Sequence, residues 1–292
     1  MLNADYKLIA KLFARRLCNV TDKLINPNQF AFIKGRNIST MLRELYDLIE
    51  NEKHANSNTI LLSIDYSKAF DTVSTKAIIS ALELYGFGEY FLKWIKILLT
   101  NRTSCVRNGG YISQEFNMER GVRQGCPISP VLFILTSELF AASVRADSNI
   151  KGIRLPNSQK FLKILQYADD ITLLIRDLID FREVLSRIKL FSKFSGLELN
   201  VKKTYAMKLG GESWVGRSES GIQFVSQIKI LGIHFSSVMD ARLITENVTG
   251  KIKSLERMCA LWSRRHLTIQ GKILILKFMG CLFLLMLYKV SV

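Results

Sequence analysis

The chain has 292 residues, of which 48% are hydrophobic and 10% aromatic. This composition supports a packed core and excludes a disordered tail, a collagen-like fibre and a low-complexity scaffold. The 41 Lys and Arg against 25 Asp and Glu give a net charge of +16. Such an excess in a folded protein favours a polyanionic partner, most often nucleic acid.

The predicted elements mix helices and strands without regular βαβ alternation, which favours an α+β fold. The first half of the chain predicts helices over 4–18 and 38–52, a strand over 59–65, two helices within 74–99, and strands over 103–107 and 111–116. A helix from about 130 follows, then strands over 161–166 and 171–175 and a helix over 178–194. The last predicted elements are strands over 204–208 and 229–236, and helices from 240 that are broken near 268–271. The Asn108-Gly109-Gly110 sequence predicts a hairpin turn.

The cysteines and the termini indicate where the protein acts. The five cysteines include no C-x-x-C pair, which fits a reducing compartment and indicates neither a disulfide framework nor a zinc site. Lys and Arg interrupt the apolar residues at the N-terminus, so no secretion signal is expected. The most apolar stretch, 278–288, is shorter than a bilayer core of ~30 Å requires and predicts a buried helix. We therefore expect an intracellular protein with no membrane partner.

Three acidic residues stand at the ends of predicted strands. Asp65 closes an apolar strand, and Asp169 with Asp170 lies in the turn between two more. Mg²⁺ prefers carboxylate and phosphate oxygens, and two such ions about 4 Å apart can activate a hydroxyl and stabilise a leaving pyrophosphate. Asp is also a common turn residue, so the spacing alone leaves an ordinary turn as the alternative.

The sequence around these three acidic residues resembles that of a known protein family. SIDYSKAFDTV (63–73), GVRQGCPISPVLF (121–133) and QYADD (166–170), in that order, resemble the palm motifs of reverse transcriptases, best those of non-LTR (LINE-type) retrotransposons. Further matches to fingers, later palm and thumb motifs are NPNQFAFIKGRNI (26–38), SGLELNVKKT (195–204), KILGIHFS (229–236) and WSRRHLTIQGK (262–272). The ordered set is specific, although no single motif is.

The resemblance implies roles for individual residues. Asp65 and Asp169 would be the principal ligands of two Mg²⁺ ions, for which Mn²⁺ could substitute, and Asp170 the supporting acid. Lys203, or the adjacent Lys202, would protonate the pyrophosphate.

Residues implied to contact substrate lie around these carboxylates. Phe70 would exclude a ribose 2′-OH, with a core phenylalanine as the alternative, and Tyr167 would lie under the primer end. Gln124 and Gly125 would form the loop against the templating base and nucleotide, where glycine permits close approach. Lys34 and Arg36 would lie near the triphosphate or template, with surface solvation as the alternative.

The C-terminal part resembles a helical thumb. Trp262, Arg264 and Arg265 combine an aromatic ring with positive charge, which suits a nucleic-acid backbone; a basic face without direct contact is the alternative. The resemblance implies partial fingers over 1–57, a palm with an antiparallel sheet over 58–238 and a truncated thumb over 239–292.

The implied function is RNA-directed DNA polymerisation with an RNA template, a DNA primer or target and dNTPs, in the nucleus or a cytoplasmic ribonucleoprotein. We expect a fragment of a longer retrotransposon polyprotein. The alternatives are an inactive nucleic-acid-binding remnant and an intron-maturase-type polymerase.

Overall fold

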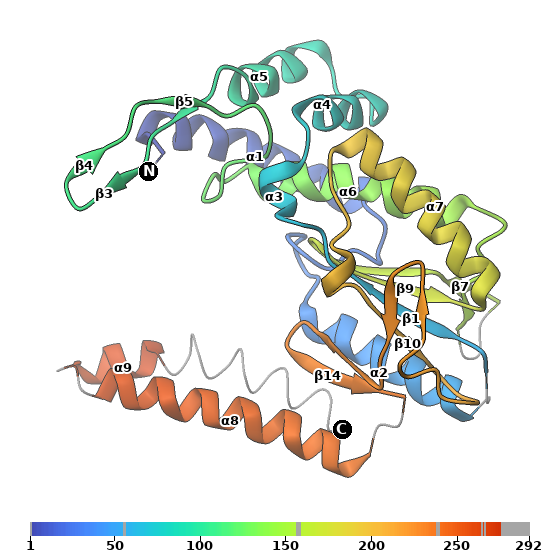
Figure 1. Cartoon of the computed structure of the whole chain (residues 1–292). Coiled ribbons are helices and arrows are strands. Elements are labelled where there is room, and N and C mark those ends of the chain that lie inside the picture. The colour runs from blue at the N-terminus through green and yellow to red at the C-terminus, as the bar shows by residue number, and fades with distance from the viewer. Residues whose placement is uncertain are drawn as a thin grey trace.

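The structure is a computed structural model that describes residues 2–54, 57–155, 159–237, 240–263, 265 and 267–275. Its centre is a six-stranded sheet with strand order β11-β12-β10-β1-β9-β8 (Figure 1). These strands are β1 (Ile60–Ile64), β8 (Ile164–Tyr167), β9 (Asp170–Ile175), β10 (Tyr205–Lys208), β11 (Ser218–Glu219) and β12 (Ile222–Phe224). Neighbouring strands are antiparallel except for β10 and β12, which are parallel. The predicted antiparallel sheet is confirmed apart from that pair.

Helices cover both faces of the sheet. They are α1 (Ala4–Leu24), α2 (Ile38–His54), α3 (Ala69–Thr72), α4 (Thr75–Leu84), α5 (Glu89–Leu99), α6 (Ser129–Ala146), α7 (Leu178–Ser195), α8 (Ala241–Ser263) and α9 (Ile269–Ile275), with a 3-10 turn η1 at Val201–Lys203. Because side chains alternate along a strand, Ile60, Leu62 and Ile64 of β1 join the core formed with α1, α4, α6 and α7. Leu61 faces the opposite side, in the core beneath α2.

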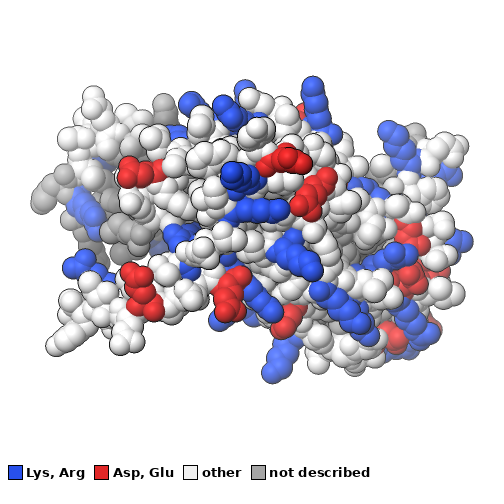
Figure 2. Space-filling model, turned by 90° about the horizontal axis from the view of Figure 1, so that it is seen from above, with Lys and Arg blue, Asp and Glu red and all other residues white. Residues whose placement is uncertain are grey.

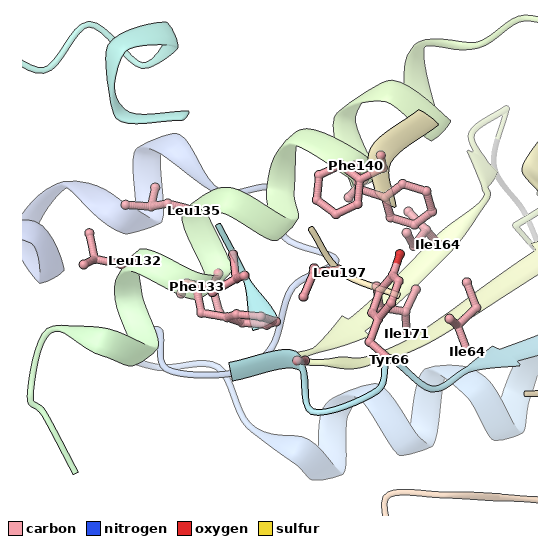
Figure 3. Packing of buried hydrophobic residues seen from close by; sticks show 14 of the residues in the cluster. Ile64, Tyr66, Leu132, Phe133, Leu135, Phe140, Ile164, Ile171 and Leu197 are labelled. Carbon is pink, nitrogen blue, oxygen red and sulfur yellow. The ribbon is translucent and has the colours of Figure 1, made fainter. Parts of the chain in front are cut away.

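Helix α6 is the central helix of the larger core. Its Phe133 and Phe140 lie between the neighbouring helices and the strand residues Ile64, Ile164 and Ile171 (Figure 3). By length and composition α6 could cross a membrane, but 67% of it is buried inside the protein. It is therefore explained as a core helix.

Four short two-stranded ribbons complete the described strands. They are β2 (Thr103–Ser104) with β5 (Phe116–Asn117), β3 (Arg107–Asn108) with β4 (Tyr111–Ile112), β6 (Ile153–Arg154) with β7 (Phe161–Leu162), and β13 (Gln227–Ile230) with β14 (Ile233–Ser236). The hairpin predicted at Gly109-Gly110 is confirmed. The single strand predicted over 229–236 is wrong, because Leu231 and Gly232 have φ values of +50° and +81° and turn the chain back. Two positive φ values in succession are typical of tight hairpin turns.

Two projections leave the sheet toward the same side of the molecule (Figure 1): the β3–β4 hairpin and helices α8 and α9. The predicted break between the last helices is confirmed, since α8 ends at Ser263 and α9 begins at Ile269. The stretch 278–288, predicted to be a buried helix, lies outside the described residues. The division into 1–57, 58–238 and 239–292 stays a prediction.

Two glycines of the loop before α6 share a backbone conformation but not their surroundings. Gly121 and Gly125 have φ values of +79° and +77°, and a Cβ at Gly121 would lie 2.5 Å from the carbonyl oxygen of Asp71, whereas a Cβ at Gly125 would meet nothing within 4 Å. We expect Gly121→Ala to lower the free energy of unfolding by about 1–3 kcal/mol more than Gly125→Ala, because only the first adds a steric clash. Urea unfolding of both variants measures the difference; equal losses would contradict the clash.

Candidate active site

The register of the central strands brings three acidic residues to one end of the sheet. β1 pairs with β9 from Ile60↔Ile175 to Ile64↔Ile171, so the next pair in that register sets Asp65 opposite Asp170. Asp169 precedes Asp170 in the turn between β8 and β9. Asp65 and Asp169 are half-buried and Asp170 is exposed. Residues directly opposite in an antiparallel pair have Cβ atoms about 5 Å apart.

Burial and nearby negative charge raise the pKa of two of these carboxylates, Asp169 and Asp170. Burial, together with the negative charge of Asp65, raises the pKa of Asp169 above its ordinary value. Asp170 reaches solvent on one side, yet the protein on its other sides displaces water from the carboxylate. This desolvation and the charges of Asp169 and Asp65 raise the pKa of Asp170 to about 6. Burial and the neighbouring negative charges therefore both disfavour the ionised forms of Asp169 and Asp170.

A site of this kind suits a hard divalent cation. The donors are carboxylate oxygens, the ligands Mg²⁺ prefers, and their mutual repulsion would be relieved by positive charge. Among the described residues, no three or more His, Cys, Asp or Glu side chains are grouped so that they alone could hold a metal ion. Mg²⁺ does not require such a group, because it is commonly held by one or two carboxylates with water and substrate phosphates. Asp65, Asp169 and Asp170 fit that kind of binding.

Asn200 and Thr204 orient Asp65. The side-chain nitrogen of Asn200 donates to Oδ2 of Asp65 at 3.0 Å, and the backbone nitrogen of Asp65 donates to Oγ1 of Thr204 at 3.3 Å. Both partners flank η1, which holds the exposed Lys202 and Lys203. Sequence reasoning used the N-x-x-K pattern for the lysine and missed the role of its first residue. The choice between the two lysines stays open.

The turn that carries Asp169 is held by a side chain from the segment 26–36. Ala168 has a φ of +57°, in the left-handed region, and its backbone nitrogen donates to Oε1 of Gln29 at 3.1 Å. Gln29 lies inside the motif that matches the fingers, but no spacing rule indicated this contact. Tyr167, on the strand before the turn, is half-buried.

Phe70 and the segment 121–125 lie together beside this end of the sheet. Phe70 is half-buried and stacks on Phe133, with ring centroids 4.5 Å apart. The backbone nitrogen of Val122 donates to the carbonyl oxygen of Phe70 at 2.7 Å. Gln124 and Gly125 are exposed, so the loop presents them to solvent. Phe70 therefore combines core packing with partial exposure, and its role as a sugar gate stays a prediction.

A buried arginine that the sequence did not single out fastens this loop. Arg102 is 4% exposed, and its guanidinium donates to the carbonyl oxygen of Gly121 at 2.7 Å and to that of Arg120 at 3.4 Å. Burial, with the nearby positive charge of Arg123, lowers the pKa of Arg102 below its ordinary value. Arg102 thus holds the backbone of this loop in place through hydrogen bonds to two of its carbonyl oxygens.

The structure separates the two basic residues of the segment that matches the fingers motif. Lys34 is exposed, whereas Arg36 binds the backbone of its own loop. The guanidinium of Arg36 donates to the carbonyl oxygens of Asn26, Gln29 and Ile25 at 2.6, 2.8 and 3.1 Å. It also forms an ion pair with Asp22 at 2.7 Å. Four hydrogen bonds leave little of its five-donor capacity, and the expected place of Arg36 near the triphosphate or template stays a prediction. Lys34 remains available for a phosphate.

The thumb-like helices carry one described aromatic–arginine contact. The guanidinium carbon of Arg265 lies 4.9 Å from the centroid of the Trp262 ring, a cation–π distance. Trp262 is half-buried and Arg265 exposed. Arg264 lies outside the described residues, and its contact with nucleic acid stays a prediction.

Comparison with known proteins identifies the class. The model of the family described as "Reverse transcriptase (RNA-dependent DNA polymerase)" matches residues 1–235. The chain belongs to this family, as the ordered motifs predicted.

Relatives of the chain come from mobile elements. An uncharacterized 149 kDa protein of transposon TX1 from Xenopus laevis is 28% identical over 240 residues, which are 81% of this chain and 18% of the relative. The Pol polyprotein of a type-1 R2 retrotransposable element from Popillia japonica is 28% identical over 216 residues, 73% of this chain and 29% of the relative. The predicted non-LTR class is confirmed, and the chain spans less than a third of either relative.

Solved structures show the same fold. Telomerase from Candida tropicalis in complex with a fragment of telomeric RNA aligns with a TM-score of 0.55 at 12% identity, over 84% of this chain and 42% of that one. The apo form of that enzyme aligns with a TM-score of 0.53 at 12% identity, over 80% of this chain and 40% of that one. The predicted α+β, right-hand polymerase fold is confirmed.

The raised pKa of Asp170 predicts a pH-dependent cost to folding in cation-free buffer. The folded carboxyl binds a proton below about pH 6, whereas an ordinary Asp does so near ~3.9. The stability it contributes is therefore present below about pH 4 and is lost as pH rises through about 6. Thermal unfolding in EDTA should show Asp170→Asn more stable than wild type at pH 7–8, with the gain disappearing below about pH 4.

The exposed loop residue Glu212 offers a control, because Glu212→Gln removes one negative charge away from the carboxylates. An Asp170→Asn gain that is constant across this pH range, or no larger than that of Glu212→Gln, would contradict the raised pKa that burial and the two neighbouring acids give Asp170.

Proposed function

We propose that the chain is the polymerase domain of a non-LTR retrotransposon protein and extends a primer 3′-OH with dNTPs on an RNA template. The observation that carries the proposal is the convergence of Asp65, Asp169 and Asp170 at one end of the sheet, with raised pKa values at the last two. Family membership over residues 1–235 supports the same reaction. Two Mg²⁺ ions held there would activate the attacking hydroxyl and stabilise the pyrophosphate.

The protein's own residues divide the remaining work. Asn200 keeps the carboxylate of Asp65 in one orientation, which preserves alignment of the reacting groups. The loop fastened by Arg102 supports Gln124 and Gly125 beside the nucleotide. Lys203 or Lys202 donates a proton to the leaving pyrophosphate.

Nucleic acid is the partner that the surface charge favours. The net charge is +16, and in the view from above Lys and Arg outnumber Asp and Glu over the visible face (Figure 2). Positive charge of this size attracts a phosphate backbone and releases counterions. An RNA template, a DNA primer or target, and a place in the nucleus or a cytoplasmic ribonucleoprotein are parts of the proposal.

Asp169→Asn tests the reaction. We expect it to abolish dTTP incorporation on poly(rA)/oligo(dT) with Mg²⁺, because it removes charge from the cation site and changes little packing. Thermal stability should not fall below that of the wild type, because the pKa of Asp169 is raised, and primer–template binding should stay near wild type. Extension at the wild-type rate would refute the site, and a wild-type chain that binds primer–template without extending it would favour the inactive remnant.

Phe70→Val tests the sugar gate. Removing the ring should raise ribonucleotide relative to deoxynucleotide incorporation by roughly ten-fold, since a lost clash of this kind is worth about 1.4 kcal/mol. Phe133→Leu is the matched control, because it removes the stacking partner of Phe70 without changing the gate residue. A ratio that stays unchanged in Phe70→Val, or shifts equally in both variants, would assign Phe70 to the core alone.

A further inference from the structure

Gln29 is a buried polar residue whose side-chain oxygen, but not its side-chain nitrogen, forms hydrogen bonds to described residues. It is 1% exposed, and its Oε1 accepts hydrogen bonds from the backbone nitrogens of Ala31 and Ala168 at 3.0 and 3.1 Å. Both neighbours are N–H donors, so the amide oxygen and not the nitrogen must face them. Within the described part of the chain, Nε2 of Gln29 is buried without a partner. The side chain of Gln29 therefore acts in the structure through its amide oxygen, as a hydrogen-bond acceptor.

The second of these donors belongs to the turn that carries Asp169. Ala168 has a φ of +57°, which residues with a Cβ adopt at a cost. It is 5% exposed, so water cannot readily replace a lost hydrogen-bond partner. The contact with Gln29 therefore stabilises the turn in its observed conformation.

Backbone hydrogen bonds join the same two segments but stop short of the turn. The nitrogen of Phe30 donates to the carbonyl oxygen of Gln166 at 2.9 Å, and the nitrogen of Gln166 donates to that of Asn28 at 2.8 Å. These bonds dock the segment 26–36 against the end of β8. The Gln29 side chain extends the docking by two residues, to Ala168 itself.

We propose that Gln29 is a positioning residue for polymerisation: its Oε1 holds the left-handed turn at Ala168 and so sets the position of Asp169. The same contact couples the loop that bears Lys34 to the carboxylate hairpin. The proposal rests on the proposed function only for the role of Asp169 in catalysis.

Gln166 provides a matched control in the same place. It is also 1% exposed, but its Nε2 donates away from the turn, to Oγ of Ser137 in α6 at 3.0 Å. Gln29→Met and Gln166→Met therefore each remove one buried amide of the same size from the same pair of segments. Only the first removes a hydrogen bond to the turn.

The experiment compares these two variants in the full chain by three measurements: hydrogen exchange of the Ala168 amide, Mn²⁺ affinity without nucleic acid, and kcat and KM for dTTP. Both variants should lose thermal stability. Only Gln29→Met should speed exchange at Ala168, weaken Mn²⁺ binding and lower kcat, each by about ten-fold or more, with KM little changed. Equal effects of the two variants, or no effect of Gln29→Met on exchange and Mn²⁺ binding, would overturn the proposal.

Ala168→Gly supplies a second test, which also serves if Gln29→Met alone does not fold. Glycine adopts positive φ without the steric cost, so the turn should depend less on Gln29. Adding Gln29→Met to Ala168→Gly should then weaken Mn²⁺ binding less than adding it to the wild type, or should fold where the single variant does not. Additive losses, or a double variant that is also unfolded, would overturn the proposal.

The outcomes separate this proposal from the proposed function. A wild-type chain that binds Mn²⁺ through Asp169 but extends no primer, with the Gln29 effects intact, would refute polymerisation and support the positioning role. A wild-type chain that extends primers, with Gln29→Met behaving like Gln166→Met, would support polymerisation and refute the positioning role of Gln29.

Discussion

Five consecutive residue pairs join β1 to β9, and their register forces acidic side chains toward one another at the end of the sheet. Like charges repel here, and this repulsion adds to burial, the larger cause, in raising the pKa values of Asp169 and Asp170. The strands cannot slip to relieve it, because a shift of one residue would turn every buried side chain of β1 to the other face. The core thus stabilises an arrangement that the site alone would disfavour, as functional sites commonly require.

The core resists such a slip because both faces of the sheet are covered. Ile60, Leu62 and Ile64 are at most 2% exposed on the side of α6, and Leu61 is fully buried on the side of α2. Burial of a side chain of this size contributes about 1.5–3 kcal/mol. Several such residues along one short strand offset the repulsion among three partly solvated carboxylates.

Around this rigid end, the loops are held by polar side chains that bind backbone. Arg36 binds carbonyl oxygens within its own segment, Arg102 those of Arg120 and Gly121, and Gln29 the turn at Ala168. A buried loop must satisfy its backbone groups, and each of these residues does so where no strand is available. These hydrogen bonds therefore fix parts of the loop backbone in place, which precise placement of reacting groups requires.

Local sequence was enough to predict the longer helices of the described residues, the strand ending at Asp65, the turn holding Asp169 and Asp170, and the family. Each follows from short-range periodicity, turn chemistry or ordered motifs. Local sequence did not show that residues 229–236 fold back at Leu231-Gly232, because their alternation suits one strand as well as two. Nor could it show that Gln29 reaches Ala168, 139 residues away, or that Asn200 reaches Asp65, 135 residues away. Those contacts exist only once the strands have paired, since no spacing along the chain encodes which distant backbone group a buried amide will meet.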